Sequence, residues 1–153
     1  AREDAPRHDH RRDAERGAAE HQADHHTEWL AGLRDPVAGR ALAAIQNRPA
    51  EDWSLERLAR ESGVSRSLLA ERFSELIGQP PMRYLSRWRI QLACRLLRED
   101  TAKVSAVAFD VGYQSEAAFS RAFKAPVGAS PGGWRRQQLF RNARRARGPR
   151  RAD

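Results

Sequence analysis

Apolar residues between about positions 29 and 133 recur at steps of three and four, and no stretch alternates strictly between apolar and polar residues. That period is typical of helices that bury one face, whereas strands alternate at every second residue. On either side, residues 1–28 have alanine as their only apolar residue, and residues 134–153 carry eight arginines. We therefore predict an all-α fold with its core in the middle of the chain. We expect a domain over residues 29–136. Before it, residues 1–28 are expected to be a polar linker, and after it, residues 137–153 a basic tail.

Capping residues divide the first part of this domain into short helices. A helix is expected to begin at Pro36, because proline suits the first turn of a helix. Ser54 precedes the next apolar run as an N-cap, and that helix ends at Gly63. Ser65 then caps another helix, which ends at Gly78. Two short helices joined by a tight glycine turn form a helix-turn-helix motif, here at about 54–78.

The same arrangement of residue types returns about fifty residues later. A small residue, a turn glycine, a cap serine, two large apolar residues and a terminal glycine occur in both places, with Gln114 as one extra residue in the second turn. In order, Ala59, Gly63, Ser65, Leu69, Phe73 and Gly78 are matched by Ala108, Gly112, Ser115, Phe119, Phe123 and Gly128. Each matched residue has the same physical role, which predicts a second helix-turn-helix at about 103–128.

Between the two motifs, about 80–99 is expected to form one long linker helix, which gives about seven helices in all. Its apolar residues follow helical steps: Leu85, Trp88, Leu92 and Leu96. Twenty residues at 1.5 Å each make a helix of roughly 30 Å. Successive major grooves on one side of a DNA duplex are ~34 Å apart. The second helices of the two motifs are therefore expected to enter adjacent major grooves. Five aromatic residues are expected in the core: Trp53, Trp88, Phe73, Phe119 and Phe123.

These motifs resemble a known family. The resemblance is carried by Leu58 to Ser65, by Gly78 to Pro81, and above all by Ser115 to Lys124 with the following Ser130-Pro131 and Trp134-Arg135. Over about Trp29 to Arg136 the chain is similar to the C-terminal DNA-binding domain of AraC/XylS-type transcriptional regulators, which has two homeodomain-like helix-turn-helix subdomains. The resemblance implies sequence-specific binding of double-stranded DNA, RNA polymerase as a further partner, and an N-terminal sensor domain outside this chain.

The sequence departs from the family pattern at Ala125-Pro126-Val127, where a basic residue and an aromatic residue are more usual. Pro126 lacks a backbone donor and is therefore expected to shorten the second recognition helix.

Base contacts in a helix-turn-helix come from exposed positions in the first turns of the second helix. Arg121 is the strongest candidate, because a guanidinium can bind guanine through two hydrogen bonds; the alternative is a surface charge that contacts only phosphate. Glu71 can accept from cytosine, and a solvated charge or an internal ion pair is an equal alternative for it. The predicted base-facing residues are Arg66, Ser67, Ala70, Glu71, Glu116, Ala117, Ser120, Arg121 and Lys124. The predicted phosphate contacts are Ser65, Ser115, Arg83, Arg87 and Arg89, although for Arg89 we favour an intradomain salt bridge.

Charge supports a polyanionic partner. Twenty-eight lysines and arginines against 20 acidic residues give a formal net charge of +8 and a pI near 11.0. No apolar run is long enough to span a bilayer, and the single cysteine, Cys94, is compatible with a reducing cytoplasm, where we expect the protein to act.

Other classes of function find less support in the sequence. No phosphate loop or catalytic triad is visible, and Cys94 lies among apolar residues of the linker helix, so we expect neither an enzyme nor a cofactor. His21 and His25 are one helical turn apart, but they lie among acids and arginines without a cysteine cluster, so no metal site is expected. A second hypothesis remains, in which the arginine-rich tail binds nucleic acid without sequence preference and the helices are a protein-interaction module.

Overall fold

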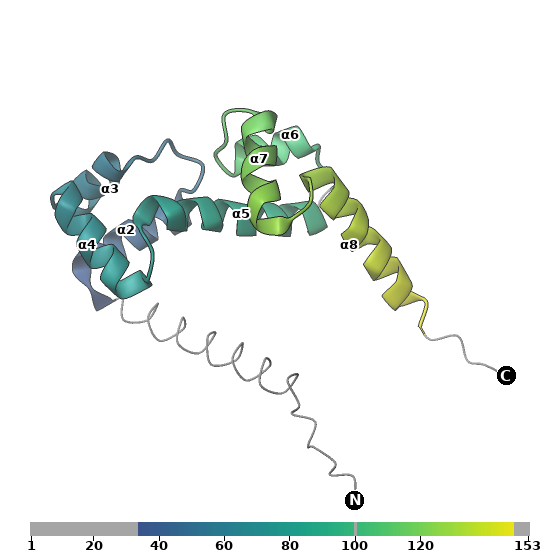
Figure 1. The fold of residues 1–153 in the computed structure, drawn as a ribbon, viewed down its shortest axis with the longest axis horizontal. Coiled ribbons are helices and arrows are strands. Elements are labelled where there is room, and N and C mark those ends of the chain that lie inside the picture. Colours follow the sequence, from purple (N-terminus) through teal and green to yellow (C-terminus); the bar gives the residue numbers. More distant parts are fainter. Residues whose placement is uncertain (1–33, 100, 149–153) are drawn as a thin grey trace, which may run out of the picture.

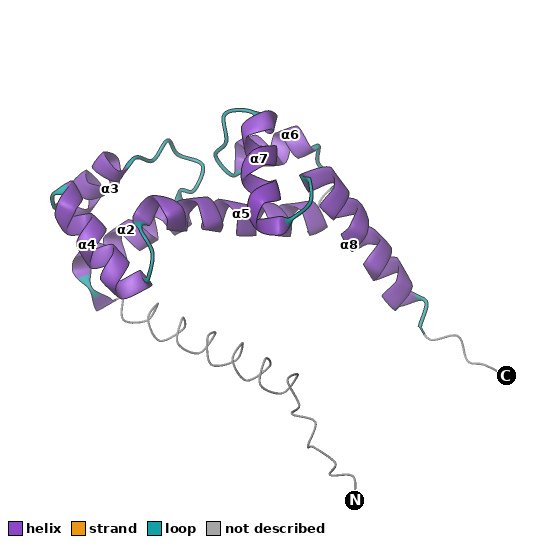
Figure 2. Cartoon of the chain, viewed as in Figure 1, coloured by secondary structure: helices purple, strands orange, loops and turns teal. Residues whose placement is uncertain are grey.

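The computed structural model describes residues 34–99 and 101–148, and these residues form seven α-helices and no strand (Figure 2). The all-α prediction is confirmed. The helices are α2 (Pro36–Asn47), α3 (Leu55–Ser62), α4 (Arg66–Ile77), α5 (Pro81–Glu99), α6 (Val104–Asp110), α7 (Glu116–Val127) and α8 (Pro131–Ala146). No helix in these two ranges combines the length and the apolarity that a membrane span needs.

The helices form two units on one long helix (Figure 1). The first unit packs α2 and α4 against the N-terminal half of α5, with α3 on α2 and α4, and the second packs α6, α7 and α8 against its C-terminal half. Each unit has its own core. The largest fully buried side chains of the first core are Leu42, Ile45, Leu58, Leu69, Phe73 and Leu85, and those of the second are Leu97, Val107, Val111, Phe119 and Phe123. Two helix-turn-helix subdomains joined by a long helix were predicted, and this is the architecture observed.

The buried side of α5 changes along the helix, and the predicted apolar stripe was therefore only partly right. Leu85 is buried in the first core, whereas Ile90 and Leu97 are buried in the second. The step of five residues from Leu85 to Ile90 turns the buried side by about 140° around a helix with 3.6 residues per turn. A single stripe cannot serve two cores on different sides, so three predicted positions are only half-buried: Trp88, Leu92 and Leu96.

The two helix-turn-helix turns have the same geometry. Gly63 and Gly112 adopt φ angles of 71° and 103°, which side chains disfavour and glycine accepts. In each turn the residue after the glycine donates its backbone N–H to the alanine at the matched position, Ala59 at 3.1 Å and Ala108 at 2.9 Å. The sequence repeat is thus a structural repeat.

Pro126 does not shorten α7, contrary to the sequence prediction. The helix runs from Glu116 to Val127 and has 12 residues, the same number as α4. The proline lies in the last turn, where its fixed φ suits the helix and its missing N–H deprives a single carbonyl of a donor. Gly128 then ends the helix by donating its N–H to the carbonyl of Lys124 at 2.8 Å.

Helix α8 continues into the segment that was expected to be a basic tail. Ser130 caps it by accepting from the N–H of Gly133 at 3.2 Å, and the helix ends at Ala146. Arginine, glutamine and alanine are good helix formers, which explains why an arginine-rich stretch remains helical. Leu139 and Phe140 are 57% and 65% exposed on this helix.

Asp35 is the N-cap of α2 and also contacts α4. Its Oδ1 accepts from the N–H groups of Val37 and Ala38, both at 3.0 Å, and its Oδ2 accepts from Nη2 of Arg72 at 2.7 Å. The hydrogen bond from Ala38 is the main reason that the pKa of Asp35 lies below its ordinary value of 3.8, and Arg72 lowers it further.

Replacing Asp35 by alanine is expected to cost about 1 kcal/mol of the free energy of unfolding at pH 7, because α2 loses its cap. Asp35→Asn keeps a capping oxygen, so its free energy of unfolding is expected to fall by only a few tenths of the loss in Asp35→Ala. Because the pKa of Asp35 is lower in the folded chain, its ionised carboxylate stabilises the folded state fully at pH values above the ordinary pKa of 3.8. This stabilisation is lost as the pH falls below 3.8 and through the lower pKa of the folded chain. Urea unfolding at pH 7 and pH 3 measures both effects. Equal losses for the two variants at pH 7 would show that the charge, and not the cap, stabilises α2.

Candidate nucleic-acid interface

Helices α4 and α7 present matched surfaces to solvent. Ser65 Oγ accepts from the N–H of Leu68 at 3.2 Å, and Ser115 Oγ accepts from the N–H of Ala118 at 3.1 Å, so both helices begin with the same cap. Each helix buries two large side chains completely: Leu69 and Phe73 on α4, and Phe119 and Phe123 on α7. The cores therefore fix which side of each helix faces outward.

The residues predicted to face the bases lie on these outward sides. Ala70 and Ser120 are half-buried and not exposed as predicted, because each lies beside a fully buried residue of its helix, Leu69 or Phe119. The other seven are exposed: Arg66, Ser67, Glu71, Glu116, Ala117, Arg121 and Lys124.

Leu68 belongs to the same surface, although the sequence analysis did not select it. It is a large apolar side chain that is 41% exposed in the first turn of α4. Leu69 holds the core position that Phe119 holds in the second motif, so its neighbour Leu68 corresponds to Ala118. A large apolar residue where the repeat has only alanine was the available signal. An exposed apolar side chain here suits contact with a thymine methyl group.

Glu71 and Arg121 make no hydrogen bond or ion pair with any part of the chain that the structure describes. For Glu71, the alternative of an internal ion pair thus finds no support among residues 34–99 and 101–148. Both side chains are available for contacts with a ligand.

Of the predicted phosphate contacts, four are exposed and one is not. Ser65, Ser115, Arg83 and Arg87 lie at the surface. Arg87 donates from Nη1 to Oε1 of Gln79 at 3.3 Å, a contact at the surface that leaves the guanidinium accessible.

Arg89 is held inside the domain, but not by the salt bridge that the sequence analysis favoured. Its Nε donates to the carbonyl of Pro49 and its Nη2 to the carbonyl of Glu51, each at 2.9 Å. The side chain is half-buried, and burial lowers its pKa. Its partners in the described chain are therefore two main-chain oxygens and not a carboxylate. Sequence reasoning could not find them because any residue supplies a carbonyl.

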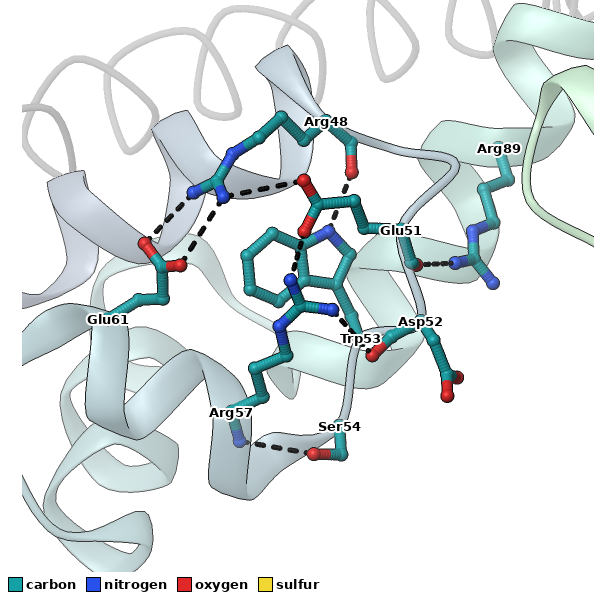
Figure 3. Close-up of polar contacts among 8 residues, drawn as sticks. All are labelled: Arg48, Glu51, Asp52, Trp53, Ser54, Arg57, Glu61 and Arg89. Carbon is teal, nitrogen blue, oxygen red and sulfur yellow. Dashed lines mark hydrogen bonds and ion pairs between the residues drawn. The ribbon is translucent and has the colours of Figure 1, made fainter.

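The loop between α2 and α3 that accepts these bonds is built around Trp53 (Figure 3). The indole is 5% exposed and donates from Nε1 to the carbonyl of Arg48 at 2.7 Å. The guanidinium groups of Arg48 and Arg57 lie 5.0 and 4.6 Å from the centre of the ring. Such cation–π contacts stabilise the ring and orient both arginines.

Two glutamates join these arginines into one network. Glu61 accepts from Arg48 at 2.9 Å, and Glu51 forms ion pairs with both Arg48 and Arg57. The hydrogen bond from Arg48 lowers the pKa of Glu61 below its ordinary range. The network holds the loop that carries the acceptors for Arg89.

No group of three histidines, cysteines, aspartates or glutamates suited to a metal ion occurs in residues 34–99 and 101–148. His21 and His25, considered above, lie outside the described residues. Burial raises the pKa of the Cys94 thiol, which keeps it protonated at neutral pH.

Known proteins were compared with the chain. The profile of a family described as "Helix-turn-helix domain" matches residues 58–137, just over half of the chain. A putative AraC-like transcription regulator of Streptomyces antibioticus is 49% identical over 72% of this chain and 37% of its own length. The HTH-type transcriptional regulator AlkR of Acinetobacter baylyi is 39% identical over 76% of this chain and 38% of its own length. The chain thus spans little more than a third of such relatives.

Solved structures of DNA-binding and response-regulator domains are also similar to the chain. The DNA-binding domain of AdpA, a global transcriptional factor solved in complex with a target DNA, is 32% identical, with a TM-score of 0.63 over 76% of this chain and 98% of that domain. The C-terminal domain of AraT, a response regulator from Geobacillus stearothermophilus, is 31% identical, with a TM-score of 0.66 over 67% of this chain and 86% of that domain. The named relatives are regulators and not enzymes, as the sequence predicted.

The candidate base-facing residues are expected to matter little for folding. Arg121→Ala and Glu71→Ala should change the free energy of unfolding by less than about 0.5 kcal/mol, since both side chains are exposed. Ser115→Ala, next to the same surface, should cost about 1 kcal/mol because it removes the cap of α7. Urea unfolding of the three variants provides the comparison. A loss of about 1 kcal/mol for Arg121→Ala would assign that side chain a structural role.

Proposed function

Because the chain belongs to the AraC-type family of helix-turn-helix proteins, we propose that it is the DNA-binding portion of a transcription regulator and recognises a specific duplex sequence. Residues 29–136 would form the DNA-binding domain, with α4 and α7 as its two recognition helices. One observation carries this proposal: the chain holds two equally built, capped helices with exposed polar faces, at fixed positions on one long helix.

The length of α5 suits simultaneous binding in two grooves. Its 19 residues correspond to about 28 Å. Adjacent major grooves on one side of the duplex lie ~34 Å apart. A single chain would therefore read two half-sites about one helical turn apart. The relative AdpA, whose DNA-binding domain was solved with its target DNA, supports duplex DNA as the ligand.

Specificity would come from the exposed residues of the two recognition helices. On α7, Arg121 would bind guanine through two hydrogen bonds, with Ser120 and Lys124 beside it. On α4, Glu71 would accept from a cytosine amino group, and Leu68 would contact a thymine methyl group. The remaining base-facing candidates are Arg66, Ser67, Ala70, Glu116 and Ala117.

Phosphate contacts would hold the domain in register. Arg83 and Arg87 are exposed near the start of α5, and the cap serines Ser65 and Ser115 stand at helix N-termini, where anions bind favourably. Arg89 is left out of this set, because its Nε and Nη2 already donate to carbonyls.

Two further partners follow for the intact regulator. The relatives are almost three times as long as the matched segment, so residues 1–28 would connect this domain to a sensor domain. RNA polymerase would be a second partner, since one relative from Escherichia coli is named as a transcriptional activator.

A second function finds support in α8. Beyond Trp134 its side chains are mostly exposed and include Arg141, Arg144 and Arg145. A helix of this charge binds nucleic acid without sequence preference. On that hypothesis the helical units would serve protein contacts only.

Selection from a random duplex pool at about 150 mM salt tests the main proposal. We expect a two-part site with half-sites about 10 bp apart. Arg121→Ala should relax the sequence of one half-site and Glu71→Ala that of the other, each with a loss of about 1–3 kcal/mol for the preferred base. Arg87→Ala is the control, because loss of a phosphate contact weakens all sequences alike. Retention without an enriched sequence would contradict specific recognition.

Deleting residues 140–153 separates the two functions. The deletion removes exposed side chains of α8 and should leave both cores intact. On the main proposal, affinity for the selected site falls less than affinity for random duplex, so specificity is kept or increased. Fluorescence anisotropy titrations with both duplexes measure this ratio. Equal, near-complete loss on both duplexes would favour the arginine-rich module.

A further inference from the structure

We propose that Arg89 is a positioning residue: it fixes the orientation of the second helix-turn-helix unit relative to the first, and so sets the half-site spacing that the domain accepts. The part about spacing rests on the proposed function, whereas the part about orientation concerns the chain alone. The inference starts from the place of Arg89 on α5, directly before Ile90, where the buried side of the helix changes from one core to the other.

On one side, Arg89 is bonded to the first unit. Its two donating nitrogens, Nε and Nη2, each lie 2.9 Å from a carbonyl oxygen of the loop between α2 and α3, those of Pro49 and Glu51. Two hydrogen bonds from one planar guanidinium fix both its position and its tilt. Lysine cannot reproduce this geometry, although it carries the same charge.

On its other side, Arg89 is in contact with the second unit. The guanidinium carbon lies 5.7 Å from the centre of the Tyr113 ring. A Cβ atom added to Gly112 would lie 2.9 Å from the guanidinium carbon and 2.8 Å from the carbonyl oxygen of Pro49. The turn of the second motif therefore rests directly on the guanidinium and on the loop of the first unit.

This close approach is particular to the junction and is not a general feature of the turn. Gly63, at the matched position of the first motif, has a similar positive φ, yet a Cβ there would meet only Nη1 of Arg40, at 3.7 Å. Two features therefore require glycine at position 112: the φ of 103° and the lack of space for a side chain beside Arg89 and Pro49.

The carbonyl acceptors are themselves held in place. They belong to the loop that Trp53, Arg48, Arg57 and Glu51 brace (Figure 3). A change at residue 89 would therefore not be compensated by a shift of this loop. It would instead alter how closely the second unit packs against the first.

Orientation can be measured without DNA. Spin labels are attached to cysteines introduced by Glu75→Cys and Ala125→Cys, at two exposed positions, in a full chain whose native cysteine is removed by Cys94→Ser. They report the distance between the C-terminal ends of α4 and α7. We expect one narrow distance distribution for the parent chain and a distribution at least twice as wide for Arg89→Lys. Arg95→Lys, an exposed arginine of α5 outside the proposed DNA contacts, is the matched control and should leave the width unchanged. An unchanged width in Arg89→Lys, with its circular dichroism spectrum intact, overturns the proposal.

Spacing is measured on the duplex that selection yields, with the half-site separation varied from two base pairs shorter to two base pairs longer. The parent chain should lose at least tenfold in affinity for a change of one base pair, and Arg89→Lys less than threefold. Arg95→Lys should follow the parent profile. Gly112→Ala, which forces the same junction apart from the other side, should also broaden or displace the profile. A profile for Arg89→Lys parallel to that of the parent overturns the proposal. If the parent selects no two-part site, the proposed function fails, while the distance measurement still decides the role of Arg89.

Discussion

One helix serves two hydrophobic cores, and the geometry of the whole domain depends on how it does so. The buried side of α5 changes by about 140° between Leu85 and Ile90, so the two units pack on different sides of the same helix. A helix alone fixes their separation, because its rise per residue is constant. The angle between the units depends in addition on the contact at Arg89, where the first unit's loop, the guanidinium and the turn at Gly112 meet.

Function follows from this arrangement through two matched recognition helices. Cap serines start α4 and α7, left-handed glycines end them, and two fully buried side chains fix the rotation of each helix about its axis. Exposed side chains such as those of Glu71 and Arg121 are therefore held on a rigid support. Neither forms an ion pair with another residue in the described ranges, so no such pair has to break when DNA binds. Pre-organisation of this kind lowers the entropic cost of association.

Much of the fold could be predicted because its signals are local. Ser65 and Gly63 act through their own backbone neighbours, and the repetition of such residues at Ser115 and Gly112 made both motifs visible in the sequence. Features that depend on contacts between distant segments were missed. Arg89 binds main-chain oxygens 40 and 38 residues away in sequence, and nothing in the residue types predicts that pairing. Pro126 was expected to shorten α7, yet the helix continues to Val127 and ends at the cap residue Gly128. The roles of the candidate base-facing residues remain predictions, since their assignment rests on exposure and helix position.

The central claim is that a single chain places two recognition helices on one side of a duplex as a rigid pair. Hydroxyl-radical footprinting of the chain on its selected duplex, at a stoichiometry verified by sedimentation equilibrium, tests this most directly. The account predicts one chain per duplex and two protected segments on the same face, about 10 bp apart. A single protected segment for one bound chain, or two segments that require two chains, would contradict it.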